Sequence, residues 1–169
     1  MSKSYNYILA ICLCFSVPIL ATDVYASEAA KSDKIETIEI NGSKGIIASQ
    51  KISSDMLNQC SRAAPDANKV SGYWAPSNQE LEVLEKLLPE YLKQQNHTLK
   101  DLSKYRRIYA GIAYNNREVI YVDFAVMYDH DPDWTKQLHV VCDGGDSFFG
   151  VEFDIKSQTF SHLYFNGPL

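Results

Sequence analysis

Apolar and polar residues alternate with a period of two over most of the second half of the chain. In the segment 105–128 this pattern predicts two strands joined at Asn115-Asn116, because asparagine tolerates the positive φ of a tight turn. The same pattern predicts three further strands, at residues 136–142, 148–155 and 158–167. The second half therefore predicts an antiparallel meander.

The alternation also predicts which way the strand 148–155 faces. We expect Phe149, Val151 and Phe153 to point into the core, because they occupy every second position. The intervening residues Gly150, Glu152 and Asp154 are expected to face outward. One face of the sheet would then be covered and the other partly wet.

The period changes to that of a helix in "APSNQELEVLEKLLPEYLKQQ", residues 75–95. Ser77 and Glu80 have the spacing of a capping box, which predicts the start of the helix. Leucines follow at helical spacing, so one face of the helix is apolar. Pro89 is expected to kink this helix or to start a second one.

The first part of the chain predicts smaller elements. Isoleucines on both sides of "NGSKG" predict a hairpin over residues 35–49. The segment 53–64 predicts a short helix that is capped by Ser53 or Ser54 and carries Cys60. Residues 65–72 are expected to form a loop.

These elements predict an α+β fold, in which one main helix packs on a four- to five-stranded antiparallel meander sheet with a short N-terminal hairpin and helix. A single domain is expected over residues 35–169. The layout resembles that of cystatin-like or nuclear-transport-factor-like proteins. This is an analogy of fold and implies no function.

The N-terminus has the composition of a secretory signal peptide. The run "YILAICLCFSVPIL" follows Lys3 and has the length of an apolar signal region, but is short for a membrane span. We expect residues 1–26 to be cleaved after Ala26, or alternatively after Ala21, and residues 27–34 to form a flexible leader. A lipid anchor at Cys12 or Cys14 is a further alternative. We therefore expect a periplasmic or secreted protein whose mature chain has no membrane span.

Two cysteines, Cys60 and Cys142, remain after removal of the signal. An even pair in an oxidising compartment predicts a disulfide. On the loop-entropy model this disulfide would stabilise the fold by about 4 kcal/mol. Two buried thiols are the alternative.

The net charge of −5 argues against nucleic acid and anionic lipid as binding partners of the protein. An acidic protein does not offer the basic face that nucleic acid requires, nor one for anionic lipid. A hydrophobic content of 46% is enough for a packed core. We therefore expect a protein partner in the cell envelope.

The segment "YDHDPDW", residues 128–134, gathers three carboxylates, a histidine and an aromatic ring. The alternate aspartates are typical of calcium loops, but the glycine and the bidentate glutamate of such a loop are missing. No zinc-type spacing of ligands is present, so we expect neither a metal nor a cofactor. The segment is our candidate contact surface, formed by Asp129, His130, Asp131, Asp133 and Trp134.

The acidic glycine stretch "CDGGDSFFG" is interpreted as a bend between two strands. Its two glycines permit unusual backbone angles, and Asp143 and Asp146 are expected to bond to the turn backbone. The alternative is an envelope hydrolase that uses Asp143 or Asp146 with His139 as catalytic groups. No recognisable nucleophile–base spacing favours this alternative.

Two stretches, "GYWAPS…LEVLEKLLPEYL" and "VVCDGGDSFFGVEFD…FSHLYFNG", carry a resemblance that spans roughly residues 72–167. In them the chain resembles a group of small exported bacterial proteins of unknown function. The resemblance implies a Gram-negative periplasm and brings no activity, cofactor or catalytic residue.

The sequence thus predicts a small exported binding protein of the inhibitor, immunity or accessory type. It would act without catalysis, through the acidic aromatic segment 129–134. A structural or secretion-accessory protein is a third class, beside the hydrolase.

Overall fold

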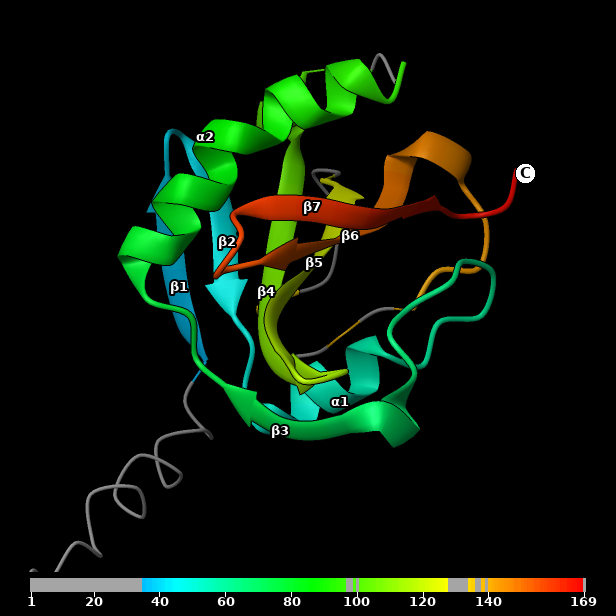
Figure 1. The fold of residues 1–169 in the computed structure, drawn as a ribbon. Coiled ribbons are helices and arrows are strands. Elements are labelled where there is room, and N and C mark those ends of the chain that lie inside the picture. Colours follow the sequence, from blue (N-terminus) through cyan, green and yellow to red (C-terminus); the bar gives the residue numbers. More distant parts are fainter. Residues whose placement is uncertain are drawn as a thin grey trace, which may run out of the picture.

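The computed structural model describes residues 35–96, 99, 101–127, 134–135, 138 and 140–168. These residues form an α+β fold around one seven-stranded, mostly antiparallel sheet (Figure 1). No helix within these ranges is both long enough and apolar enough to cross a membrane.

The helices and strands follow one another in this order: β1 Glu36–Ile40, β2 Ser43–Ile47, α1 Gln50–Met56, β3 Val70–Trp74, α2 Asn78–Gln94, β4 Tyr105–Tyr114, β5 Arg117–Val126, β6 Phe148–Asp154 and β7 Thr159–Phe165. Short 3-10 turns lie at Ala67–Lys69, Leu102–Lys104 and Gly145–Ser147.

The sheet has the order β1-β2-β4-β5-β6-β7, and β3 pairs with β4 beside β2. The predicted meander of four to five strands is therefore confirmed only as part of a larger sheet. The N-terminal hairpin belongs to that sheet, because β2 runs parallel to β4. This parallel pairing encloses α1, β3 and α2 in one long crossover connection.

The first hairpin confirms the expected turn. Asn41 and Gly42 both have positive φ, 52° and 77°, as a two-residue turn with right-handed strand twist requires. The short helix that follows differs from the prediction. It is capped by Ser49, whose side chain accepts from Ile52 N, and it ends before Cys60. The prediction was shifted because several serines in a row offered rival caps.

The main helix is confirmed with its capping box. The Ser77 side chain accepts from the Glu80 backbone, and the Glu80 side chain accepts from Ser77 N at 2.7 Å. The helix runs as one element through Pro89 to Gln94, so no second helix starts there. Its buried face consists of Leu81, Leu84, Glu85, Leu88 and Leu92.

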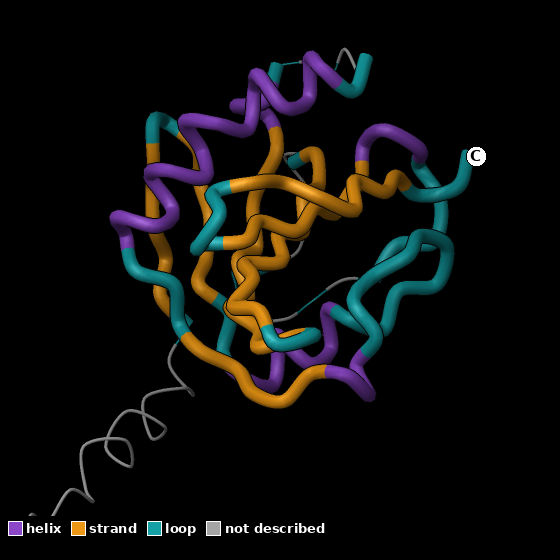
Figure 2. The backbone as a smooth tube through the Cα atoms, in the orientation of Figure 1, coloured by secondary structure: helices purple, strands orange, loops and turns teal. Residues whose placement is uncertain are grey.

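The strands lie between the two helices, so each face of the sheet packs against one helix (Figure 2). On the first face α2 packs on the aromatic and aliphatic residues of β4, β5 and β6, including Phe149, Val151 and Phe153. On the second face α1 packs on Ile108, Ala110 and other residues of β4 and β5.

On this second face His162 and Tyr164 are partly exposed, but the expectation that Glu152 and Asp154 face the solvent is wrong. Glu152 and Asp154 do alternate with the core phenylalanines, but they are 3% and 8% exposed. Polar residues in a period-two pattern were read as solvent-facing, whereas these are buried in ion pairs across the second face.

Two strand assignments also differ from the prediction. Residues Val70–Trp74 form β3, where a loop was expected to extend to residue 72. Conversely, Leu138 and Val140–Cys142, the described part of the predicted strand 136–142, lie in no strand. Apolar runs of this length do not distinguish a strand from a loop that packs on the core.

Candidate functional site

A disulfide joins Cys60 to Cys142, as the sequence predicts. It connects the loop after α1 with the loop before the Gly145–Ser147 turn, across a sequence separation of 82 residues. Both cysteine residues are exposed. The bridge therefore fastens two surface loops to each other rather than filling the core.

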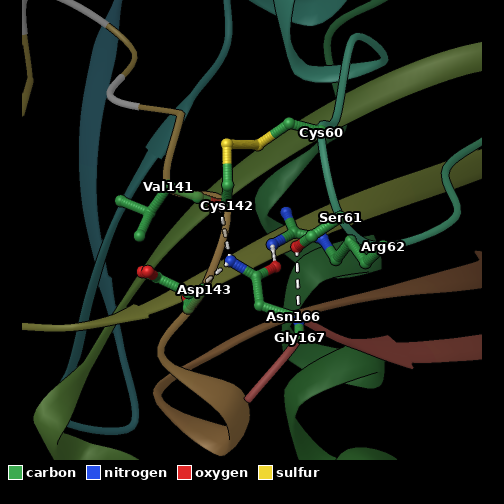
Figure 3. Close-up of a disulfide and its surroundings, with 8 residues drawn as sticks. All are labelled: Cys60, Ser61, Arg62, Val141, Cys142, Asp143, Asn166 and Gly167. Carbon is green, nitrogen blue, oxygen red and sulfur yellow. Dashed lines mark hydrogen bonds between the residues drawn. A yellow bond between two sulfur atoms is a disulfide. The ribbon is translucent and has the colours of Figure 1, made fainter. Parts of the chain in front are cut away.

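Polar contacts reinforce this bridge at the end of β7 (Figure 3). The Asn166 side chain donates to the carbonyls of Val141 and Asp143, at 2.6 Å and 3.0 Å. On the other loop, Ser61 Oγ accepts from Gly167 N at 3.3 Å. The residues after β7 thus tie the two disulfide-linked loops to the sheet.

Arg62, two residues after the disulfide, is buried beneath these loops. Its guanidinium forms an ion pair with Asp123 of β5, and both side chains are less than one tenth exposed. A second nitrogen donates to Asn166 Oδ1 at 2.7 Å. Burial raises the pKa of Asp123, and the positive charges of Arg62 and Arg106 oppose that rise.

The predicted contact segment has only one described member. Asp129, His130, Asp131 and Asp133 lie outside the described residues, whereas Trp134 is described and half-buried. Trp134 packs against the second-face core, and the Arg106 guanidinium lies 5.6 Å from its ring. Met127, just before the segment, donates its N–H to Lys104 O at 2.9 Å.

The acidic glycine stretch forms a turn that leads into β6, but it does not join two strands, because Val140–Cys142 before it lie in no strand. Gly144 and Gly145 have φ values of 94° and 55°. The carbonyls of Asp143 and Asp146 accept from the Asn166 side chain and the Tyr105 hydroxyl. Asp143 and Asp146 are both exposed. His139, their partner in the hydrolase hypothesis, lies outside the described residues.

A third group of polar residues lies on β5, β6 and β7, and sequence reasoning missed it. Glu152 is at its centre, with a side chain that is 4% exposed. His162 Nδ1 lies 3.0 Å from Glu152 Oε2, and Arg117 Nη2 lies 3.6 Å from the same atom. Arg117 also lies 3.6 Å from Asp154. We call these four residues the Glu152 cluster.

An irregularity in β7 brings His162 to Glu152. The register between β6 and β7 shifts between Gly150 and Glu152, so that β7 holds one extra residue. His162 has a φ of 52° in this bulge. Such bulges redirect a side chain, and left-handed backbone is tolerated by histidine better than by most residues. The alternation of the sequence carries no signal of a bulge, which is why this contact was missed.

Tyr121 extends the Glu152 cluster into the interior. It is 1% exposed, and its hydroxyl makes no hydrogen bond of standard geometry within the described residues. A Cβ at Gly150 would lie 2.6 Å from this hydroxyl, so glycine is needed there for the ring to pack. Burial raises the pKa of Tyr121 to about 12, so the hydroxyl keeps its proton at neutral pH.

Other polar features on the α2 face have a structural explanation. Glu85 of α2 accepts from Arg107 Nε at 3.0 Å and from the Tyr109 hydroxyl at 2.8 Å, which joins the helix to β4. A small pocket of about 110 Å³ lies between the start of α2 and the β6–β7 turn, beside Val83 and Phe153.

Among the described residues, no group of three or more histidine, cysteine or acidic side chains is placed to hold a metal ion. Comparisons of the chain with protein-family models, with curated proteins and with solved structures each found no match. The functional argument therefore rests on the residues themselves.

Proposed function

We propose that the protein is an exported, non-catalytic binding domain that recognises a protein partner in the cell envelope through the segment Asp129–Trp134. The observation that carries this proposal is the fixing of both flanks of the segment. Met127 is bonded to Lys104, and Trp134 is packed on the core beside Arg106. A contact surface held in this way loses less conformational entropy on binding than a free loop does.

The disulfide supports the same proposal, because it anchors the chain on the C-terminal side of the segment. It fixes Cys142 eight residues after Trp134, and Asn166 fixes Val141 beside it. The chain between Met127 and Cys142 is thus attached to the domain at three points. These anchored residues on either side of a polar, aromatic segment favour its use as a specific contact surface.

Charge defines the expected partner. The segment carries three aspartates in a protein of net charge −5, so a basic cleft on the partner is the complementary surface. Such complementarity accelerates encounter and selects the partner more than it increases affinity. Export to the periplasm or the medium is part of this proposal, supported by the signal-like N-terminus and by a disulfide on exposed residues.

The test is a binding measurement with charge-neutral variants of the segment. A protein recovered from envelope extract with the tagged mature chain is purified, and its association rate is measured at low and high salt. Asp129→Asn, Asp131→Asn and Asp133→Asn together should slow association at least tenfold at low salt. The matched control removes the same number of charges outside the segment, by neutralising the exposed residues Asp143, Asp146 and Glu39.

Equal slowing by the two triple variants would overturn the proposal, because general charge and not the segment would then govern binding. Trp134→Ala is unsuitable as a first test, because Trp134 packs against the core and beside Arg106.

The control variant also tests the hydrolase hypothesis. If the wild type cleaves glycan or cell-wall substrates and the variant with Asp143→Asn and Asp146→Asn does not, the hydrolase class would replace the binding class.

A further inference from the structure

The chain contains two asparagine–glycine pairs, Asn41-Gly42 and Asn166-Gly167. An asparagine followed by glycine can react with its own backbone, because the glycine nitrogen can attack the side-chain carbonyl of the asparagine. Glycine favours this attack, since it has no Cβ to restrict the backbone or to shield the nitrogen. The two pairs carry the same reacting groups, so their surroundings in the fold decide which of them reacts.

The first pair lies at an exposed turn. Asn41 and Gly42 are both exposed and form the two-residue connection between β1 and β2. Within the described residues, the Asn41 side chain takes part in no hydrogen bond or ion pair. A Cβ added to Gly42 would have no atom within 4 Å, so the turn has room for the ring that the attack forms.

The second pair is held in place by its neighbours (Figure 3). Asn166 is 5% exposed, and its side-chain nitrogen donates to the carbonyls of Val141 and Asp143. The attacking nitrogen is engaged as well, since Gly167 N donates to Ser61 Oγ at 3.3 Å. Asn166 therefore reaches the geometry of attack only when this part of the structure opens locally.

We propose that Asn41 is a site of spontaneous deamidation in the folded protein, and that the isoaspartate product releases β1 from the edge of the sheet. Gly42 N attacks Asn41 Cγ and forms a succinimide ring. The proton of that nitrogen passes through solvent to the departing amide nitrogen, which leaves as ammonia. One water molecule then opens the ring at either carbonyl and yields aspartate or isoaspartate. The net reaction converts an amide and water into a carboxylate and ammonium.

The aspartate product should leave the turn intact. Asn41 has a φ of 52°, and aspartate tolerates left-handed backbone as asparagine does. This product adds one negative charge to a chain of net charge −5 and leaves the length of the backbone unchanged.

The isoaspartate product changes the backbone itself. Its main chain runs through the former side chain, so the turn gains one methylene carbon. A hairpin turn of defined length fixes the register of its strands, which here places Ile40 opposite Ser43. β1 lies at the edge of the sheet, whereas β2 is also held by its parallel pairing with β4. The strand that should loosen is therefore β1.

The experiment incubates the mature protein at pH 8.5 and 37 °C and follows both asparagines by mass spectrometry of tryptic peptides. Trypsin places the two pairs on separate peptides, 35–44 and 157–169, each with a single asparagine. Asn41 should react at least about tenfold faster than Asn166, because Asn166 reacts only from a locally opened state. The reduced protein in urea is the matched control, in which the two rates should become similar.

Hydrogen exchange tests the release of β1. Exchange of the amides of residues 36–40 should accelerate in the incubated wild type as isoaspartate accumulates. Asn41→Gly removes the side-chain amide and keeps a residue that accepts the positive φ, so its β1 should not change on incubation. The comparison of the two deamidation rates uses the wild type alone and does not depend on the folding of this variant.

Equal rates at the two asparagines in the folded protein would overturn the proposal, because the fold would then not select the site. So would an Asn41 that stays intact over the time in which the unfolded chain reacts. If isoaspartate accumulates at position 41 and the exchange of β1 does not change, the release of β1 is refuted.

Discussion

The ion pair of Arg62 and Asp123 should be among the most destabilising places to substitute one residue. Arg62→Met removes the guanidinium from Asp123 and from Asn166, while the apolar side chain retains most of the volume. Asp123 then stays buried at 6% exposure without its partner. Breaking a buried pair in this way costs about 3–5 kcal/mol.

The assay is urea unfolding of the oxidised protein, followed by tryptophan fluorescence. With an m-value of about 2 kcal/mol/M, a cost of about 4 kcal/mol lowers the midpoint by about 2 M. Arg62→Met with Asp123→Leu should recover much of the loss, because no unpaired charge is left behind. The matched control is Lys51→Met, whose pair with Asp55 is exposed and should cost about 1 kcal/mol or less.

The cost should also depend on pH. Burial raises the pKa of Asp123, and loss of Arg62 removes a charge that opposes this rise. In the variant, folded Asp123 therefore binds its proton more readily than unfolded Asp123 does, which stabilises the fold as pH falls. The deficit of Arg62→Met should be smaller at pH 4.5 than at pH 8. A loss below about 1 kcal/mol at pH 8 would refute this account of the pair.

Three further perturbations test the rest of the fold. Replacing Cys60 and Cys142 by serine opens a loop with a sequence separation of 82. Urea unfolding should show a loss of about 4 kcal/mol, and stability should no longer depend on reductant. Gly111→Ala places a Cβ 2.4 Å from the carbonyl oxygen of Trp74 and should lower the free energy of unfolding by about 1–3 kcal/mol. Gly72→Ala is the control, because its Cβ would lie 3.9 Å from the nearest atom and should change stability little. Backbone N–H groups of the β6–β7 turn donate to the Asp154 carboxylate and lower its pKa. The contribution of Asp154 to stability is therefore present above its unfolded-state pKa and is lost as pH falls. Asp154→Asn should flatten the acid side of the plot of stability against pH.

Local signals in the sequence predicted local structure well. The capping box at Ser77, the turn at Asn115-Asn116 and the inward set of β6 were all confirmed, because each depends on residues close in sequence. The disulfide was predicted from the number of cysteines and from the expected export, without any geometry.

Long-range features were not predicted, for physical reasons. The parallel pairing of β2 with β4 joins residues some sixty positions apart, and no local pattern specifies it. Glu152 was expected in solvent because its position alternates with core residues, yet Arg117 and His162 accompany it on the buried face. A bulge such as that of His162 breaks the period of two, on which the prediction depended.

The most direct test of the proposed function is site-specific photo-crosslinking from the contact segment. A benzophenone amino acid replaces His130 in the protein, and a second variant carries it at the exposed Ser71 of β3 as a control. After irradiation in cells, adducts are isolated and identified by mass spectrometry. The account predicts one protein adduct from position 130 that is absent from position 71 and that disappears when Asp129, Asp131 and Asp133 are neutralised. The same adduct from both positions, or one that persists in the neutralised variant, would contradict it.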